Sequence, residues 1–313
     1  MKPKIITLTE MKKIVLSLDL MSAIESGFTS YSANRAVVPP VGELILDKGE
    51  VHIKYGYIKN EDFYVVKIAS GFYGNPDIGL PCGDGLMLLF KQETGELVSI
   101  LLDEGYLTDI RTGIAGAIAA KYLAPKNVQR IGIVGTGVQA RFQLSSLCHV
   151  TDCKDVLVSG LNEQFLQSYK ADMEKLGYQI ETTLDTSQIL PSCNLIVTTT
   201  PSKEPLLFAK DLRKGVHITA MGSDTQEKQE LDSQILKKAD VVVADSISQC
   251  LVRGEIHKAL EANLIKPENL IELGDVISGQ VAGRMSDEQI TVADLTGVAV
   301  QDIKIAEAVY NFS

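Results

Sequence analysis

The segment RIGIVGTGVQARFQ, at residues 130 to 143, constrains the fold of this chain more than any other feature. An apolar, β-branched run leads directly into a glycine-rich turn, and a stretch with helical spacing follows. Within the turn, Gly135 permits a tight bend, Gly137 lets the backbone approach a pyrophosphate, and Ala140 allows the helix to pack closely on the strand. The free N–H groups at the helix start would hold the anion. A dinucleotide site is therefore expected here rather than an ordinary glycine turn, formed by Gly135, Thr136, Gly137, Val138, Gln139 and Ala140.

The second half of this fingerprint is an acid at the end of the next strand, which would bind the ribose of NAD. The corresponding strand ends VLVSGLNE, with Ser159 to Asn162 at the relevant positions and Glu163 one step too far. Asn162 is the candidate cofactor contact in this stretch. No arginine stands there to pair with a 2′-phosphate, so the choice between NAD and NADP stays open.

The segments before position 105 indicate an antiparallel sheet. Short stretches with β character alternate with turn formers such as DKGE and GNPD, which is typical of a meander. The expected strands are residues 42 to 46, 51 to 58, 62 to 72, 85 to 90 and 96 to 102. Ahead of them, SLDLMSAIESGFTSYSANR has near-helical apolar spacing and predicts a covering helix.

The segments after position 105 indicate a parallel sheet. TDIRTGIAGAIAAKYLAP predicts a helix capped by Thr108 or Asp109 and ended by Pro125. Apolar β-branched runs then alternate with amphipathic stretches, the pattern of parallel strands covered by helices on both faces. The expected strands begin at or near Arg130, Asp155, Asn194, Val216 and Asp240, and the last segment, from Thr291, predicts a strand, a glycine turn and a closing helix.

Composition excludes several classes of protein. The 313 residues carry 40 acidic and 30 basic side chains, a formal charge of −10, so nucleic acid is not an expected partner. No run approaches the roughly 18 apolar residues that span a bilayer, and no signal peptide is recognisable, so we expect a cytoplasmic protein without membrane association. Five scattered cysteines and four unclustered histidines predict neither disulfides nor a metal site.

Several segments, in order, resemble the ornithine cyclodeaminase and mu-crystallin family. They are VVPP, VKIASGFYGNP, GLP, TGEL, LTDIRTG, GTGVQA, TTTPSKEPLL, MGSDTQEKQEL and DLTGVAVQD. The resemblance implies an α/β protein: a Rossmann-type doubly wound parallel sheet domain, residues 113–295, and an antiparallel α+β substrate-binding and dimerisation domain, residues 1–112 with 296–313. It also implies a homodimer that moves hydride between NAD(P)H and the α-carbon of a small amino or imino acid.

The resemblance assigns roles to individual residues. Arg111 matches the arginine that binds the substrate carboxylate, as an alternative to a surface arginine. Lys67, in the apolar strand VVKIAS, matches a lysine of the site, as an alternative to a lysine on the exposed face. Asp224 matches the catalytic aspartate that assists proton transfer at the substrate nitrogen, as an alternative to a helix cap. The expected cofactor contacts beyond the glycine turn are Asn162, Thr199, Thr200, Met221, Gly222, Thr296 and Gly297.

Two departures narrow the expected substrate. In ornithine cyclodeaminases a glutamate that receives ornithine's side-chain ammonium stands thirteen residues before the strand lysine, and here that position is Lys54. A cation there would repel the ammonium and favour a carboxylate instead. Cys82 replaces a small hydroxylic residue and is a candidate substrate contact or, more ordinarily, a packing residue.

The leading hypothesis is an NAD(P)H-dependent oxidoreductase that reduces a cyclic ketimine such as Δ1-pyrroline-2-carboxylate to L-proline. The alternatives are an ornithine cyclodeaminase, which forms proline and ammonia with bound NAD, an alanine dehydrogenase, and a non-catalytic, NADP-dependent binder of the crystallin kind.

Overall fold

The computed structural model describes residues 2–313, and the chain divides into two compact units. The first unit comprises Met1–Arg111 and Val298–Ser313, and the second comprises Thr112–Gly297. The boundary at residues 111 and 112 falls within one helix, α3 (Tyr106–Leu123).

The first unit is built on a seven-stranded sheet with the order β1-β7-β6-β5-β4-β2, and β3 also pairs with β4. All its pairings are antiparallel except that of β1 with β7. The five strands expected from the sequence are confirmed, whereas β1 and β2 were not expected. The strands are β1 (Lys4–Thr7), β2 (Ala36–Val37), β3 (Gly42–Leu46), β4 (Gly49–Ile58), β5 (Phe63–Gly71), β6 (Gly83–Lys91) and β7 (Leu97–Leu102).

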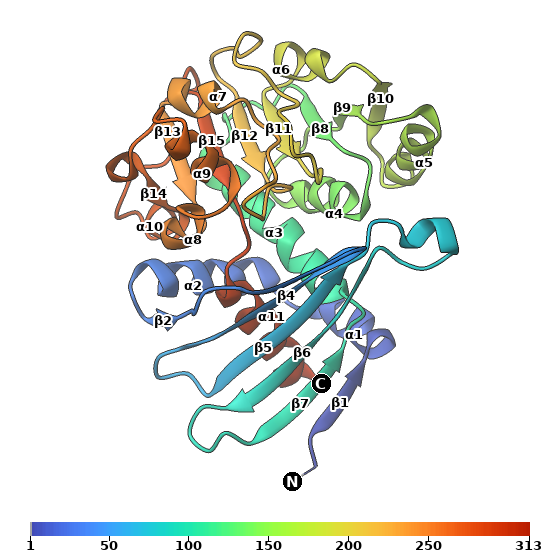
Figure 1. The fold of residues 1–313 in the computed structure, drawn as a ribbon, viewed down its shortest axis with the longest axis vertical. Helices are drawn as coiled ribbons and strands as arrows, with labels where there is room; N and C mark the ends of the chain where they lie inside the picture. Colours follow the sequence, from blue (N-terminus) through green and yellow to red (C-terminus); the bar gives the residue numbers. More distant parts are fainter. Residues whose placement is uncertain (1) are drawn as a thin grey trace. The chain divides into compact units, whose positions relative to one another are not determined.

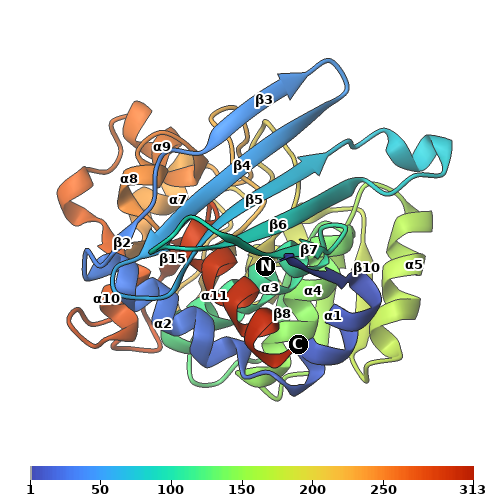
Figure 2. The same cartoon turned by 90° about the horizontal axis from the view of Figure 1, so that it is seen from below.

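Helices cover one face of this sheet. The expected helix α2 (Leu20–Ser32) packs against α11 (Ala299–Phe312), the last helix of the chain, and α11 contacts β4, β5 and β6 (Figures 1 and 2). Alternate residues of β5 point to this covered face, so Phe63, Val65 and Lys67 are buried. Each buried apolar side chain there contributes about 1.5–3 kcal/mol. A short helix, α1 (Leu8–Ile14), completes the unit.

The second unit is built on an eight-stranded, fully parallel sheet with the order β10-β9-β8-β11-β12-β15-β13-β14. The expected strands are confirmed, and β10 and β14 extend the two edges. The strands are β8 (Ile131–Val134), β9 (Asp155–Ser159), β10 (Gln179–Thr183), β11 (Leu195–Thr198), β12 (His217–Ala220), β13 (Val241–Ala244), β14 (Ile271–Glu272) and β15 (Thr291–Asp294).

The parallel sheet separates two apolar clusters. Leu195 and Val197 of β11 belong to one cluster and Ile196 to the other, as alternation along a doubly covered strand requires. Residues of α4 and α5 complete the first cluster, and residues of α6, α7 and α9 complete the second. The helices are α4 (Val138–Ser146), α5 (Glu163–Glu174), α6 (Ile189–Ser192), α7 (Ser233–Lys238), α8 (Ile247–Cys250), α9 (Gly254–Glu261) and α10 (Leu273–Ile277).

Helix α3 begins earlier than its sequence pattern indicates. It starts at Tyr106, so Thr108 and Asp109 lie inside the helix and the expectation that one of them caps it is wrong. A backbone N–H of the first turn is instead bound by Asp103, whose Oδ2 accepts a hydrogen bond of 2.9 Å from Leu107. Among residues 2–313, none of the helices combines the length and the apolar character that a membrane span requires.

Candidate functional site

Four charged side chains meet on the covered face of the sheet in the first unit. Lys54 of β4 stands directly opposite Lys67 of β5 in the strand register, so both side chains point to the same face. Arg111 comes from α3 and Asp302 from the first turn of α11. The Lys67 Nζ lies 3.2 Å and the Arg111 Nε 3.0 Å from the Asp302 Oδ1. We call Lys54, Lys67, Arg111 and Asp302 the cation cluster.

All members of the cation cluster are buried. Lys54, Lys67 and Arg111 expose 5%, 2% and 4% of their surface. The alternatives of a lysine on the exposed face and of a surface arginine are therefore wrong. Burying charged groups is costly unless opposite charges and hydrogen bonds compensate them. Asp302 is the carboxylate that both Lys67 and Arg111 contact, so it compensates part of their charge.

Burial and neighbouring charges set the protonation of this cluster. Burial and, to a lesser extent, the charge of Arg111 lower the pKa of Lys67 to about 7, whereas the charge of Asp302 opposes this drop. Burial alone would raise the pKa of Asp302, but Arg111, Lys67 and Lys54 hold that pKa below its usual value. A lysine whose pKa is near 7 exchanges its proton readily at neutral pH, which is the property of a proton-transfer group.

Cys82 lies outside the cation cluster. It is half-buried and immediately precedes β6, where Gly83 pairs with Gly71, whereas Lys67 pairs with Met87 further along the same strand. At about 3.3 Å per residue, the four residues from Gly83 to Met87 span about 13 Å. The structure thus brings Lys54, Lys67 and Arg111 together but leaves Cys82 apart.

Sequence reasoning missed Gln301 and Asp302, which both lie in the segment DLTGVAVQD. Each exposes only 1% of its surface, and Gln301 Oε1 accepts a hydrogen bond of 3.0 Å from Arg111 Nη1. The sequence pattern could have identified Asp302, because this acid lies three and seven residues before Ile305 and Val309 and therefore on the same, otherwise apolar, face of the helix.

The expected cofactor residues gather at one edge of the sheet in the second unit. They follow the carboxyl ends of five strands that are neighbours in the order β9-β8-β11-β12-β15. Ligands of open α/β sheets bind at this edge, at the point where the strand order reverses, and β8 with its neighbour β11 is that point. The segments are those containing Asn162, Gly135 to Ala140, Thr199 and Thr200, Met221 and Gly222, and Thr296 and Gly297.

The glycine turn after β8 has the geometry that a pyrophosphate needs. Gly135 has a φ of 110°, and a Cβ there would lie 2.6 Å from the Thr199 Oγ1. A Cβ at Gly137 would meet nothing within 4 Å, so this glycine faces open space. Gly137 is also the N-cap of α4, where no side chain forms a capping hydrogen bond. The helix start therefore offers its N–H groups to an anion, and the residues fit a dinucleotide.

A buried glutamate, which sequence reasoning also missed, ties two of these loops together. Glu230 accepts hydrogen bonds from Thr198 Oγ1 at 2.6 Å, from Thr200 Oγ1 at 2.8 Å and from the Gly222 N–H at 2.9 Å. Burial raises the pKa of Glu230 to about 6, against the effect of these donors. A Cβ at Gly222 would lie 2.2 Å from the Thr200 carbonyl oxygen, so only glycine fits beside this clamp.

Asp224 lies in the loop that follows β12. Its Oδ1 accepts a hydrogen bond of 2.7 Å from Lys228 Nζ, and Arg253 Nη1 donates to its carbonyl oxygen at 3.2 Å. No helix begins at Asp224, because the next helix, α7, starts at Ser233 and is capped by Asp232. The alternative of a helix cap at Asp224 is therefore wrong.

The remaining cofactor candidates also have structural partners. Asn162 caps α5, since its Oδ1 accepts a hydrogen bond from the Phe165 N–H at 2.9 Å. Asp245, at the end of β13, accepts a hydrogen bond of 2.6 Å from the Gly297 N–H and one of 3.2 Å from Thr296 Oγ1. Gly297 has a φ of 83°, which favours glycine in this turn.

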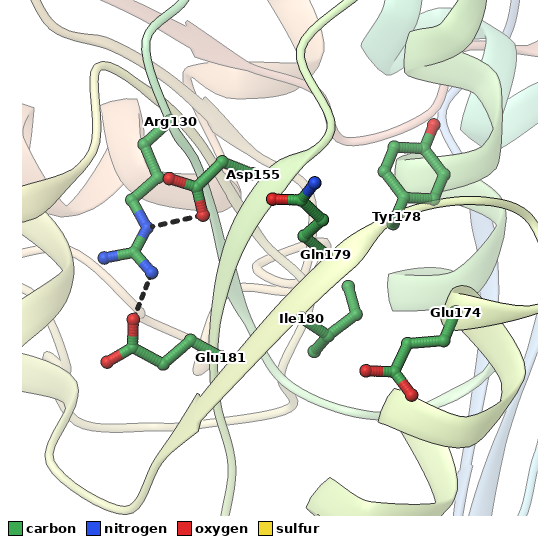
Figure 3. Close-up of a pocket in the computed structure, with 7 residues that line it drawn as sticks. All are labelled: Arg130, Asp155, Glu174, Tyr178, Gln179, Ile180 and Glu181. Carbon is green, nitrogen blue, oxygen red and sulfur yellow. Dashed lines mark hydrogen bonds and ion pairs between the residues drawn. The ribbon is translucent and has the colours of Figure 1, made fainter.

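A cavity of about 500 Å³ lies elsewhere, near the amino ends of β8, β9 and β10 (Figure 3). Arg130 in this cavity forms ion pairs with Asp155 and Glu181, which balance its charge. The amino ends of parallel strands are not where open α/β sheets bind ligands. We therefore do not assign this cavity to the dinucleotide site.

The chain is similar to proteins of one family over nearly its whole length. The family model for the ornithine cyclodeaminase/mu-crystallin family matches residues 1–312. An uncharacterised cyclodeaminase of Sinorhizobium fredii is 41% identical over 310 residues, which are 97% of this chain and 93% of that protein.

Two solved structures share the fold and hold a dinucleotide. An archaeal alanine dehydrogenase dimer with bound NAD is 36% identical, with a TM-score of 0.91 over 100% of this chain and 96% of the other. The Δ1-pyrroline-2-carboxylate reductase of Thermococcus litoralis, in complex with NADH and L-proline, is 27% identical, with a TM-score of 0.93 over 99% and 97%. These likenesses confirm the fold class expected from the sequence. The chain belongs to the ornithine cyclodeaminase/mu-crystallin family.

Proposed function

We propose that this protein is an NAD(P)H-dependent reductase of a cyclic α-imino acid, with Δ1-pyrroline-2-carboxylate reduced to L-proline. The observation that carries the proposal is the cation cluster, a buried group of cations able to receive a small carboxylate. The glycine turn at Gly135 and Gly137 supports the cofactor. Bound NAD(P)H would supply the hydride to C2 of the ring.

The charges of the site suit a substrate with one carboxylate. When Lys67 is protonated, the three cations of the cation cluster outnumber its one carboxylate, Asp302, and Asp103, whose pKa burial raises, is a further acid whose charge interacts with Lys67. This excess of positive charge suits a monocarboxylate. The planar guanidinium of Arg111 fits a carboxylate with two hydrogen bonds, and Lys54 adds a point charge.

The proton for the imine nitrogen has two candidate sources. Lys67 is favoured because its pKa of about 7 makes its proton available at neutral pH. Asp224, with Lys228 hydrogen-bonded to it at 2.7 Å, is the second. Lys67 belongs to the first unit and Asp224 to the second.

A spectrophotometric assay tests this function. Purified protein with NADH or NADPH is given Δ1-pyrroline-2-carboxylate, and oxidation of the reduced nicotinamide is followed. Arg111→Gln should raise KM strongly, whereas Arg130→Gln, which removes an arginine from a surface ion-pair network, should leave KM unchanged. If no imino acid causes oxidation with either cofactor, the proposed function is wrong.

A second candidate is alanine dehydrogenase, which the likeness to the archaeal enzyme favours. Its imino intermediate is also a small α-imino monocarboxylate, so the cation cluster would serve it equally. Reduction of pyruvate that depends on ammonia would identify it.

Ornithine cyclodeamination is disfavoured because Lys54, opposite Lys67, would repel a second ammonium. Release of ammonia from ornithine, without net change in nicotinamide, would instead show that the protein is a cyclodeaminase. Binding of an imino acid without any turnover would favour the non-catalytic, crystallin-like binder.

We also propose a homodimer. The archaeal relative is a dimer. The first unit exposes apolar side chains of β3 and β4, including Leu44, Ile45 and Tyr55. Isolated exposed side chains are ordinary, but apolar residues grouped on neighbouring strands are typical of interfaces. Light scattering coupled to gel filtration should give twice the mass of the chain, and a monomer mass at micromolar concentration would contradict this assignment.

A further inference from the structure

In the part of the chain that the structure describes, the side-chain oxygen of Gln301 forms a hydrogen bond, whereas its side-chain nitrogen forms none. Gln301 exposes 1% of its surface, and its Oε1 accepts a hydrogen bond of 3.0 Å from Arg111 Nη1. Its Nε2 is buried and has no hydrogen-bond partner among residues 2–313. Buried polar groups normally have partners, so this orphaned donor requires an explanation.

The partner fixes which way the amide points. A guanidinium has only donors, so the glutamine must present its oxygen to Arg111 and direct its NH₂ group elsewhere. The NH₂ group offers donors and no acceptor. It therefore suits an acceptor-only ligand, and a carboxylate is the ligand of that kind for which the neighbouring cations are also suited.

We infer that Gln301 is a substrate-binding residue, whose Nε2 donates a hydrogen bond to one oxygen of the imino acid carboxylate while its Oε1 holds Arg111 in place. The inference rests on the proposed function, because it concerns the carboxylate of that substrate. Gln301, in the first turn of α11, would then be an uncharged hydrogen-bond donor beside the charged side chains of the cation cluster.

Two variants of Gln301 separate binding from folding. Gln301→Met keeps the length of the side chain and removes both hydrogen-bonding ends. Gln301→Glu keeps an oxygen for Arg111 but replaces the donor by a second oxygen, which repels a carboxylate. The control is Gln92→Met, in the same unit, because the Gln92 amide donates only to the backbone carbonyls of Ile58 and Phe63, both at 2.9 Å.

Two independent measurements are made on each protein. The first is KM and kcat for Δ1-pyrroline-2-carboxylate, and the second is the Kd of L-proline by calorimetry with the cofactor present. Tm and the Kd of NADH report on folding and on the cofactor site. In Gln301→Met we expect KM and the L-proline Kd to rise about 10- to 100-fold, the range for a hydrogen bond to a charged group. The Kd of NADH should stay within about threefold, a margin small against that range.

The pH dependence of Gln301→Glu gives a readout that a purely structural role would not move. Its defect in KM should exceed that of Gln301→Met at pH 8 and shrink as the pH falls toward 5, because the protonated carboxyl regains a donor. Gln92→Met should lower Tm without changing KM or the L-proline Kd.

The outcomes distinguish the inference from the proposed function. If the unsubstituted protein turns over imino acids and Gln301→Met has unchanged KM and L-proline Kd, the inference is wrong and the function stands. If the unsubstituted protein binds L-proline without turnover, the function is wrong, and the calorimetric comparison still decides the role of Gln301. Protein that neither binds L-proline nor turns over imino acids contradicts both.

Discussion

Lys67 should make the ligand-free protein more stable as the pH rises above 7, the reverse of the effect of a lysine whose pKa an ion pair raises. Its pKa falls from 10.5 in the unfolded chain to about 7 in the folded one, chiefly through burial. Between these values the unfolded state binds the proton more tightly, so the free energy of unfolding rises as the pH rises from 7 toward 10.5. The destabilisation by Lys67 is fully present below pH 7.

The magnitude follows from the same two values. At about 1.4 kcal/mol per pKa unit, the drop from 10.5 to about 7 corresponds to about 5 kcal/mol over the full range, of which about 3 kcal/mol falls between pH 7 and 9.5. Lys67→Met removes the titrating group and keeps an apolar side chain of similar length. The difference in unfolding free energy between the unsubstituted protein and this variant should therefore change by about 3 kcal/mol over that interval, in favour of the unsubstituted protein at high pH.

Urea unfolding of both proteins at half-unit steps of pH, without ligand, measures this difference and cancels the titration of groups that do not interact with Lys67. Adding L-proline should flatten the dependence, because the carboxylate favours the charged lysine. A difference that stays constant from pH 7 to 9.5 would show that Lys67 titrates alike in the folded and unfolded chain. In that case our assignment of Lys67 as a proton donor near neutral pH would fail with it.

Three further changes test other parts of the site. Gly137→Ala should weaken NADH binding at least about tenfold while changing the unfolding free energy by less than about 1 kcal/mol, because its Cβ meets nothing in the protein. Gly74→Ala, another open glycine, is the control in NADH titrations and should bind normally. Asp224→Asn should lower kcat by about 10²- to 10⁴-fold with little change in the Kd of NADH, and equal losses in both would refute a role in proton transfer. Lys54→Glu should raise KM for the imino acid in steady-state assays, and an unchanged KM would place Lys54 outside the carboxylate site.

The strands and the cofactor turn could be predicted from the sequence because their signals are local. The run ahead of Gly135 and the alternation along β5 each lie within about ten residues, the range over which periodicity is informative. By contrast, β1 pairs with β7, so that Lys4 stands opposite Ser99. The residues near Lys4 do not indicate that their segment pairs with a strand so far along the chain. The start of α3 was missed because the side chain that binds its first turn, Asp103, stands three residues before the helix.

In the candidate site, too, the residues with a local signal could be predicted, and those that depend on tertiary packing could not. Lys67 and Arg111 were identified from their segments, but the groups that orient them, Gln301 and Asp302, lie some two hundred residues away along the chain. Their role depends on where α11 packs, which is a tertiary property. The clamp by Glu230 was missed for a related reason, since a glutamate in a polar segment is ordinarily a surface residue.

The return of the chain to its first unit has a consequence for biosynthesis. The strands β1 to β7 leave the ribosome before Thr112–Gly297, whereas α11, which covers β4, β5 and β6, is made only after that second unit. During that interval the apolar face of the sheet lacks its cover, and Lys67 lacks Asp302. Domains usually fold in order of synthesis, but here the second unit is complete while the first still waits for its last helix. The nascent chain should therefore expose this apolar face until α11 emerges, and the cation cluster should form only after the second unit has been made.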